Sequence, residues 1–150
     1  MQIRDQHRVI YTPRPQSYAA LMEMYETNYM RLRLLCGDVR LLNDTNPSII
    51  PKGTPIVLRV LDRAAHTTTI MLSYQFKTGD KKSRPDLRVR IYHDSRQAEV
   101  ISRRCRLSGE NISAWESKAD SALLCRWRLN RFLYKWVAYL RRQGHSFQNK

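Results

Sequence analysis

Short runs of alternating apolar and polar residues, joined by hairpin-length connections, occupy the middle of the chain. The run LRVRIY at 87–92 places three apolar side chains on one face of an extended strand and three polar or aromatic ones on the other. The following residues, 93–96, predict a hairpin turn, because Asp and Ser side chains bond turn amides. Strands are predicted at 56–61, 67–76, 87–92 and 98–105. Such closely spaced strands favour an antiparallel sheet with one apolar face.

Amphipathic helices are predicted on both sides of these strands, at 17–37 and at about 121–143. Ser17 is a candidate N-cap, and Gly37 and Gly144 are candidate terminators. In the first helix the expected buried stripe is Tyr18, Leu21, Tyr25, Tyr29, Leu32 and Leu35. In the second, the stripe around Leu129 is Ala122, Cys125, Phe132, Leu133, Trp136 and Leu140.

The resulting order predicts an α+β domain at 17–144: an N-terminal helix, an antiparallel sheet of four to five strands and a C-terminal helix, with both helices packed on one sheet face. Residues 1–16 and 145–150 are interpreted as tails. Residues 38–43 are a candidate short strand, and 43–55, rich in Asn, Pro and Gly, are a predicted loop. A length of 150 residues favours a single domain.

Positive charge is concentrated towards the C-terminus. The formal net charge is +14, and residues 121–150 contain six Arg and Lys between Arg126 and Arg142 but no Asp or Glu. A surface of this kind attracts phosphates, anionic membranes or acidic proteins. Arginine also grips phosphate bidentately and stacks on aromatic rings.

The candidate polyanion-binding residues lie mainly on the second helix, with two on the outward face of the sheet. They are Arg126, Trp127, Arg128, Arg131, Tyr134, Lys135, Arg141 and Arg142, with Arg88 and Arg90. Arginines opposite one another across strands would favour an anionic partner on that face. We expect RNA or DNA phosphates as the partner, bound without sequence specificity; an acidic protein is the alternative. The structural explanation is that these arginines cover their own tryptophan or pair with Glu23 and Glu26.

A second candidate group comprises Tyr92, His93, Asp94 and Glu99. Neighbouring His and acidic residues can act as an acid–base pair or hold a metal. Because His93 and Asp94 are adjacent, a turn stabilised by Asp94 explains them better. The sequence contains no Gly-rich phosphate loop and no nucleophile motif, so we expect no enzyme activity, cofactor or metal. Asn28 and Asn130 are expected to cap backbone groups.

The cysteines and the N-terminal sequence indicate the cellular compartment of the protein. There are three cysteines, an odd number, without a Cys-x-x-Cys pair, which predicts buried thiols. The N-terminus lacks an apolar signal region, and no apolar run approaches the length of a membrane span. A cytoplasmic protein is predicted.

Four stretches resemble the YqiB-like proteins, a bacterial family of unknown function. They are YAALMEMYETNYMRLRLL at 18–35, LRVLDRAAHTTTI at 58–70, LRVRIYHDSRQAEV at 87–100 and LNRFLYKWVAYLRRQG at 129–144. The third contains Tyr92, His93, Asp94 and Glu99. The resemblance implies one shared fold over about 18–144 and a cytoplasmic setting. It implies no activity, cofactor or catalytic residue.

Overall fold

The computed structural model describes residues 17–75, 86–101 and 115–148, with side chains in the last helix described from residue 122. In chain order the elements are α2 (Tyr18–Cys36), the 3-10 helix η1 (Val39–Leu41), β1 (Thr45–Ser48), β2 (Ile56–Arg63), β3 (Thr67–Tyr74), β4 (Asp86–Tyr92), β5 (Gln97–Val100) and α3 (Trp115–Arg142). The predicted tail at 1–16 and the ends of the strands predicted at 67–76 and 98–105 lie outside the described residues.

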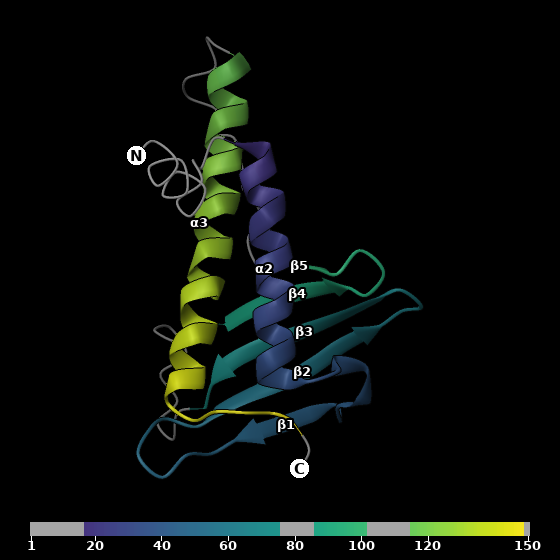
Figure 1. The fold of residues 1–150 in the computed structure, drawn as a ribbon, viewed down its shortest axis with the longest axis vertical. Helices are drawn as coiled ribbons and strands as arrows, with labels where there is room; N and C mark the ends of the chain where they lie inside the picture. Colours follow the sequence, from purple (N-terminus) through teal and green to yellow (C-terminus); the bar gives the residue numbers. More distant parts are fainter. Residues whose placement is uncertain (1–16, 76–85, 102–114, 149–150) are drawn as a thin grey trace, which may run out of the picture.

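The sheet is antiparallel with strand order β1-β2-β3-β4-β5, and both helices cover one of its faces (Figure 1). Leu58, Leu72 and Leu87 lie opposite one another on adjacent strands and are buried beneath the helices. This alternation of buried and exposed residues follows from the twofold repeat of a strand. The predicted α+β class and the element order are confirmed.

Helix α2 begins and ends where its capping residues predict. The Ser17 side chain accepts a hydrogen bond from the Ala20 amide (3.2 Å), and Gly37 ends the helix with a positive φ of 69°. Four of the six residues of the predicted stripe are buried, Tyr29 within it is half-buried, and Tyr18, at the first position, is 70% exposed. Tyr18 was therefore wrongly assigned to the core.

Residues 38–48 differ from the prediction. The candidate strand at 38–43 contains η1, whose start is capped by the Asp38 side chain through the Arg40 amide. The predicted loop at 43–55 contains β1, which pairs with β2. The Asn46 side chain bonds the backbone of Asn43 and the Leu58 carbonyl, and so joins β1 to β2. The sequence of β1, TNPS, contains no apolar alternation that would predict it.

Helix α3 begins at Trp115, before the predicted start near residue 121. Leu133, Trp136 and Leu140 pack against the sheet in the main core. Asn130 is fully buried, and its Oδ1 accepts a hydrogen bond from the Val100 amide (2.9 Å). Its expected role as a cap for a neighbouring backbone group is confirmed. Among the described residues, neither helix combines the length and the apolar character needed to cross a bilayer.

The cysteines differ from one another. Cys36 is a free thiol in the core, where burial raises its pKa. Cys125 is disulfide-bonded, so the prediction of three thiols is wrong at this position. Cysteine spacing alone does not reveal which residues the fold brings together.

The segment predicted as a C-terminal tail is a packed part of the domain over residues 145–148. The Phe147 amide donates to the Leu35 carbonyl (2.9 Å), and the phenyl ring is buried in the core. His145 is also buried, with Nδ1 2.9 Å from Ser48 Oγ. This segment therefore joins the end of α3 to α2 and β1.

Acidification will destabilise the protein partly through His145. Burial lowers the pKa of His145, an effect partly offset by the Thr54 backbone. Below the ordinary histidine pKa of about 6.5 the unfolded chain binds the proton more readily. The free energy of unfolding will therefore fall as pH drops through that value, and level off below the lowered folded-state pKa. The loss will be about 1.4 kcal/mol per unit of pKa displacement.

The measurement is urea denaturation from about pH 7.5 to about pH 4.5, with His145→Asn as the comparison. Asparagine keeps a polar group beside Ser48 and does not titrate. Burial also lowers the pKa of His93, but that contribution is common to both proteins and cancels. Identical pH profiles for the two proteins would show that His145 is not the buried neutral group inferred here.

Candidate polyanion-binding surface

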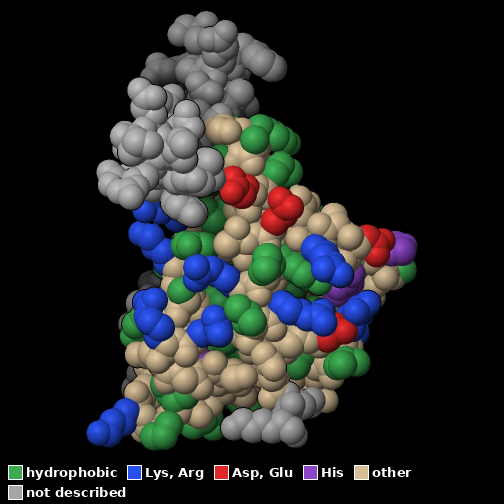
Figure 2. Space-filling view, viewed as in Figure 1, with side chains coloured by type: hydrophobic (Ala, Val, Ile, Leu, Met, Phe, Trp, Pro, Cys, Tyr) green, Lys and Arg blue, Asp and Glu red, His purple; other side chains and the backbone are tan. Residues whose placement is uncertain are grey.

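Four basic side chains form a stripe along the α3 face that points away from α2. Arg128, Arg131, Lys135 and Arg142 are spaced three, four and seven residues apart, which places them on one side of a helix, and all are exposed. Within the described residues, no carboxylate lies within ion-pair distance of any of them. Figure 2 shows Lys and Arg over α3 and also towards the far end of the sheet, where they lie beside Asp and Glu; the other Asp and Glu on this face lie over α2.

Two exposed aromatic rings lie beside this basic stripe, and neither was among the predicted site residues. Phe132 and Tyr139 are each 44% exposed. They lie seven residues apart and therefore on the same side of α3. Phe132 was assigned to the buried stripe, although its position on the helical wheel lies at the edge of that stripe. Its ring contacts Trp136, with 5.8 Å between ring centroids.

The two predicted stacking residues do not lie on this surface. Trp127 is only 5% exposed and packs against Leu21 and Tyr25 of α2, so its assignment to the wet face is wrong. The Tyr134 ring lies under the Arg31 guanidinium, 3.9 Å from the ring centroid, and its hydroxyl accepts a hydrogen bond from Arg31. Both rings face α2 because α3 packs against the other helix as well as the sheet.

Two of the predicted arginines lie in a network centred on Glu99. Arg126 Nη1 is 3.9 Å from Glu99 Oε2, and the Tyr92 hydroxyl donates to the other carboxylate oxygen. Arg90 lies opposite Glu99 on the neighbouring strand and beside the Tyr92 hydroxyl. Burial and the Glu99 charge raise the pKa of Tyr25 to about 12. Glu99 therefore partly offsets the charge of Arg126, has Arg90 opposite it on β4, and lies where α2, α3 and the sheet meet.

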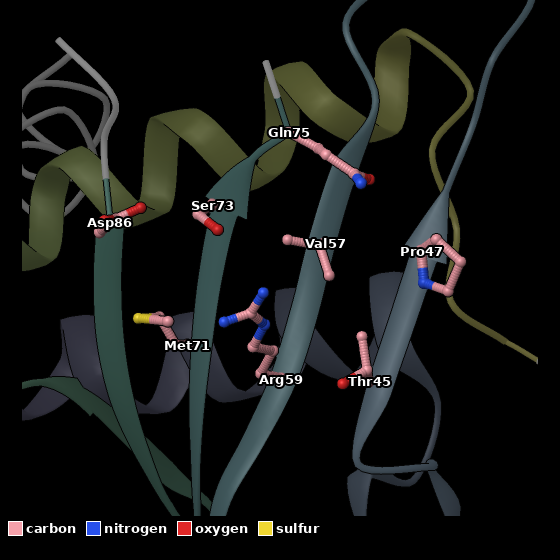
Figure 3. Close-up of a pocket in the computed structure, with 8 residues that line it drawn as sticks. All are labelled: Thr45, Pro47, Val57, Arg59, Met71, Ser73, Gln75 and Asp86. Carbon is pink, nitrogen blue, oxygen red and sulfur yellow. The ribbon is translucent and has the colours of Figure 1, made fainter. Parts of the chain in front are cut away.

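The outward face of the sheet is not a concentrated positive surface. Arg59 and Arg88 both lie opposite Met71, and Arg90 lies opposite Thr69 and Glu99, so the expected facing arginines do not occur in the described strands. A hollow of about 450 Å³ opens on this face (Figure 3). It is lined by Thr45, Pro47, Val57, Arg59, Met71, Ser73, Gln75 and Asp86. Its one arginine and one aspartate carry no net formal charge. Arg141, which is exposed, lies outside the α3 stripe on the helical wheel.

Residues 31–146 match the family described as "Protein of unknown function (DUF1249)", which is well over half of the chain. The chain belongs to the DUF1249 family. No curated protein and no solved structure matches it. Membership confirms the expected family without an assigned function, whereas the YqiB-like name and a bacterial source stay predictions. The matched range contains the α3 stripe and the five strands that the structure describes in this DUF1249 protein.

In this DUF1249 protein, His93 and Asp94 join two hairpins. His93 Nε2 lies 2.8 Å from Thr68 Oγ1, and the His93 amide donates to the His66 carbonyl (2.9 Å). Asp94 Oδ2 lies 2.9 Å from His66 Nδ1. The predicted turn at 93–96 is confirmed, but the described partner of Asp94 lies on the neighbouring hairpin.

The surroundings of His93 are those of a structural histidine. Burial lowers its pKa, and the positive charge of Arg40 acts in the same direction. His93 and Asp94 bond to different partners, so they do not form an acid–base pair with each other. Within the described part of this DUF1249 protein, no three His, Cys, Asp or Glu side chains are grouped to hold a metal ion.

Proposed function

We propose that the exposed face of α3 binds the phosphates of RNA or DNA without sequence specificity. The observation that carries the proposal is the stripe of Arg128, Arg131, Lys135 and Arg142, which is exposed and has no carboxylate partner among the described residues. Phosphate contacts release condensed counterions, which supplies affinity independent of sequence. The stripe extends over about 21 Å, because each helical residue rises about 1.5 Å.

The exposed rings favour single strands over duplexes. Phe132 and Tyr139 lie along one margin of the stripe, where unpaired bases could stack while the backbone contacts Arg128 and Lys135. Base–aromatic stacking contributes about 1–3 kcal/mol per base and tolerates any sequence. We therefore expect tighter binding to single-stranded than to double-stranded RNA of equal length.

Binding of the intact chain to mixed-sequence single-stranded RNA will weaken steeply with salt. Arg131→Gln and Lys135→Gln will each reduce the slope of log affinity against log salt by about 0.7, because each removes about one phosphate contact. The measurement is a fluorescence anisotropy titration at several salt concentrations. Arg59→Gln, on the outward face of the sheet, is the charge-matched control and will leave the slope near its original value.

Two outcomes contradict the proposal. One is the absence of RNA and DNA binding at low salt. The other is an equal loss of slope in Arg59→Gln and Arg131→Gln, which would show attraction to overall charge and not to α3.

A second candidate function is docking to an acidic protein, and a different surface supports it. Met30 and Leu34 are 67% and 53% exposed on α2, four residues apart, with Arg33 also exposed on this helix. An acidic partner with apolar residues would complement such a surface. Capture of the same partner after nuclease treatment, and its loss in Met30→Ser, would favour docking over nucleic-acid binding.

A further inference from the structure

Helices α2 and α3 extend beyond the edge of the sheet at β5 (Figure 1). An open crevice lies there, lined by residues of both helices and of β5. It encloses about 540 Å³. Its apolar wall comes from Leu21, Met22 and Tyr25 of α2 and Leu123 of α3, and its charged lining residues are Glu99 and Arg126. Leu21 and Tyr25 also pack against Trp127, so these walls are fixed by the second hydrophobic cluster. The volume is within the roughly 300–1,000 Å³ typical of small-molecule sites.

At the mouth of the crevice lies Arg126, whose hydrogen-bonding capacity is only partly taken up by Glu99. Arg126 is half exposed, and its contact with Glu99, at 3.9 Å, is longer than a hydrogen bond. Glu99 is better satisfied, because one of its oxygens accepts a hydrogen bond from Tyr92. A guanidinium has five N–H donors in a planar fork that matches a carboxylate. Arg126 can therefore bind an anionic group at the mouth while Glu99 keeps its bond to Tyr92.

We propose that this crevice binds a small amphipathic carboxylate, with its apolar part against Leu21, Met22 and Leu123 and its anionic head on Arg126. Apolar walls with one directed charged donor are typical of sites for such ligands. The site is separate from the nucleic-acid surface proposed above, because Arg126 and Arg128 lie on different sides of α3. Failure of either proposal leaves the other standing.

The test is a titration of the full chain with decanoate as the probe, measured by isothermal titration calorimetry. We expect saturable binding with Kd at or below about 1 mM. Arg126→Gln will weaken it by about tenfold or more, because a charge-assisted hydrogen bond is lost. Arg128→Gln, on the opposite side of α3, will bind decanoate as the original protein does. Leu123→Trp, which fills the crevice, will abolish binding.

Decyltrimethylammonium, with the same chain length and the opposite charge, should bind at least tenfold more weakly than decanoate. Equal binding of the two ligands would mean that Arg126 does not select the head group, and would overturn the proposal. So would the absence of saturable decanoate binding, or equal losses in the Arg126 and Arg128 variants. Circular dichroism of each variant will establish that it is folded before titration.

Discussion

Replacing Trp127 with alanine will destabilise the folded protein by about 3–5 kcal/mol, the usual result of removing a large buried ring. The indole is 5% exposed and packs against Ala20, Leu21 and Tyr25. This second cluster joins the first half of α2 to α3 beyond the edge of the sheet. Among the α3 side chains that the structure describes, Trp127 is the buried member of this cluster, and Leu123 and Leu124 are partly buried and pack against it. The measurement is urea denaturation followed by far-ultraviolet circular dichroism.

Phe132→Ala is the matched control, because it removes an aromatic ring from the same helix but from its exposed side. We expect a loss of stability of no more than about 1 kcal/mol, as for most surface substitutions. The effects on RNA binding should be the reverse of those on stability. Phe132→Ala will weaken RNA binding, whereas Trp127→Ala, measured under conditions where it is folded, will keep the salt dependence of the original protein. Equal destabilisation by the two substitutions would place the indole at the surface.

The elements that the sequence predicts well are those specified by neighbouring residues. Ser17 and Gly37 bound α2 because capping and positive φ are local properties. The strand at 86–92 follows from its own alternation, and the turn at 93–96 follows from its composition. The antiparallel order then follows from the short connections.

The sequence predictions are wrong where a contact with a residue distant in the sequence determines the structure. Trp127 lies about 160° from Leu129 on a helical wheel, which implies exposure if α3 has one buried side. In the fold α3 contacts both the sheet and α2, so it buries two sides and exposes the remainder. β1 was missed for a related reason, because the Asn46 side chain bonds the Leu58 carbonyl, which the fold brings beside it.

The candidate site was predictable in its location but not in its composition. The absence of carboxylates after residue 120 correctly indicates a positive α3. Which arginines are offset depends on Glu99, which lies 27 positions before Arg126 and reaches it only through the packing of α3 on β5. Tertiary packing likewise determines which aromatic rings are exposed. It leaves Phe132 and Tyr139 at the surface and places Trp127 and Tyr134 against α2.

Replacing Asn130 with leucine will cost about 2–4 kcal/mol of stability, although the two side chains are close in size. Asn130 Oδ1 accepts from the Val100 amide (2.9 Å), and its Nδ2 donates to the Arg126 carbonyl (2.8 Å). Leucine leaves the Val100 amide buried without a partner, at a cost of about 1–3 kcal/mol. β5 is the edge strand of the sheet that the structure describes, so loss of this cap will also loosen the contact between β5 and α3.

Asn28→Leu provides the comparison, because it removes a buried amide of the same kind with different bonding. The Asn28 Nδ2 donates to the Asn130 carbonyl (3.0 Å), while its Oδ1 is buried and has no hydrogen-bond partner. Leucine removes that unpaired oxygen together with the donor, so the two effects oppose each other and the net loss should stay below about 1 kcal/mol. Urea midpoints of the two variants will separate them, and hydrogen exchange at Val100 will accelerate only in Asn130→Leu. A larger loss in Asn28→Leu than in Asn130→Leu would show that Asn130 does not secure the sheet edge, and that the contact between the two helices depends on Asn28.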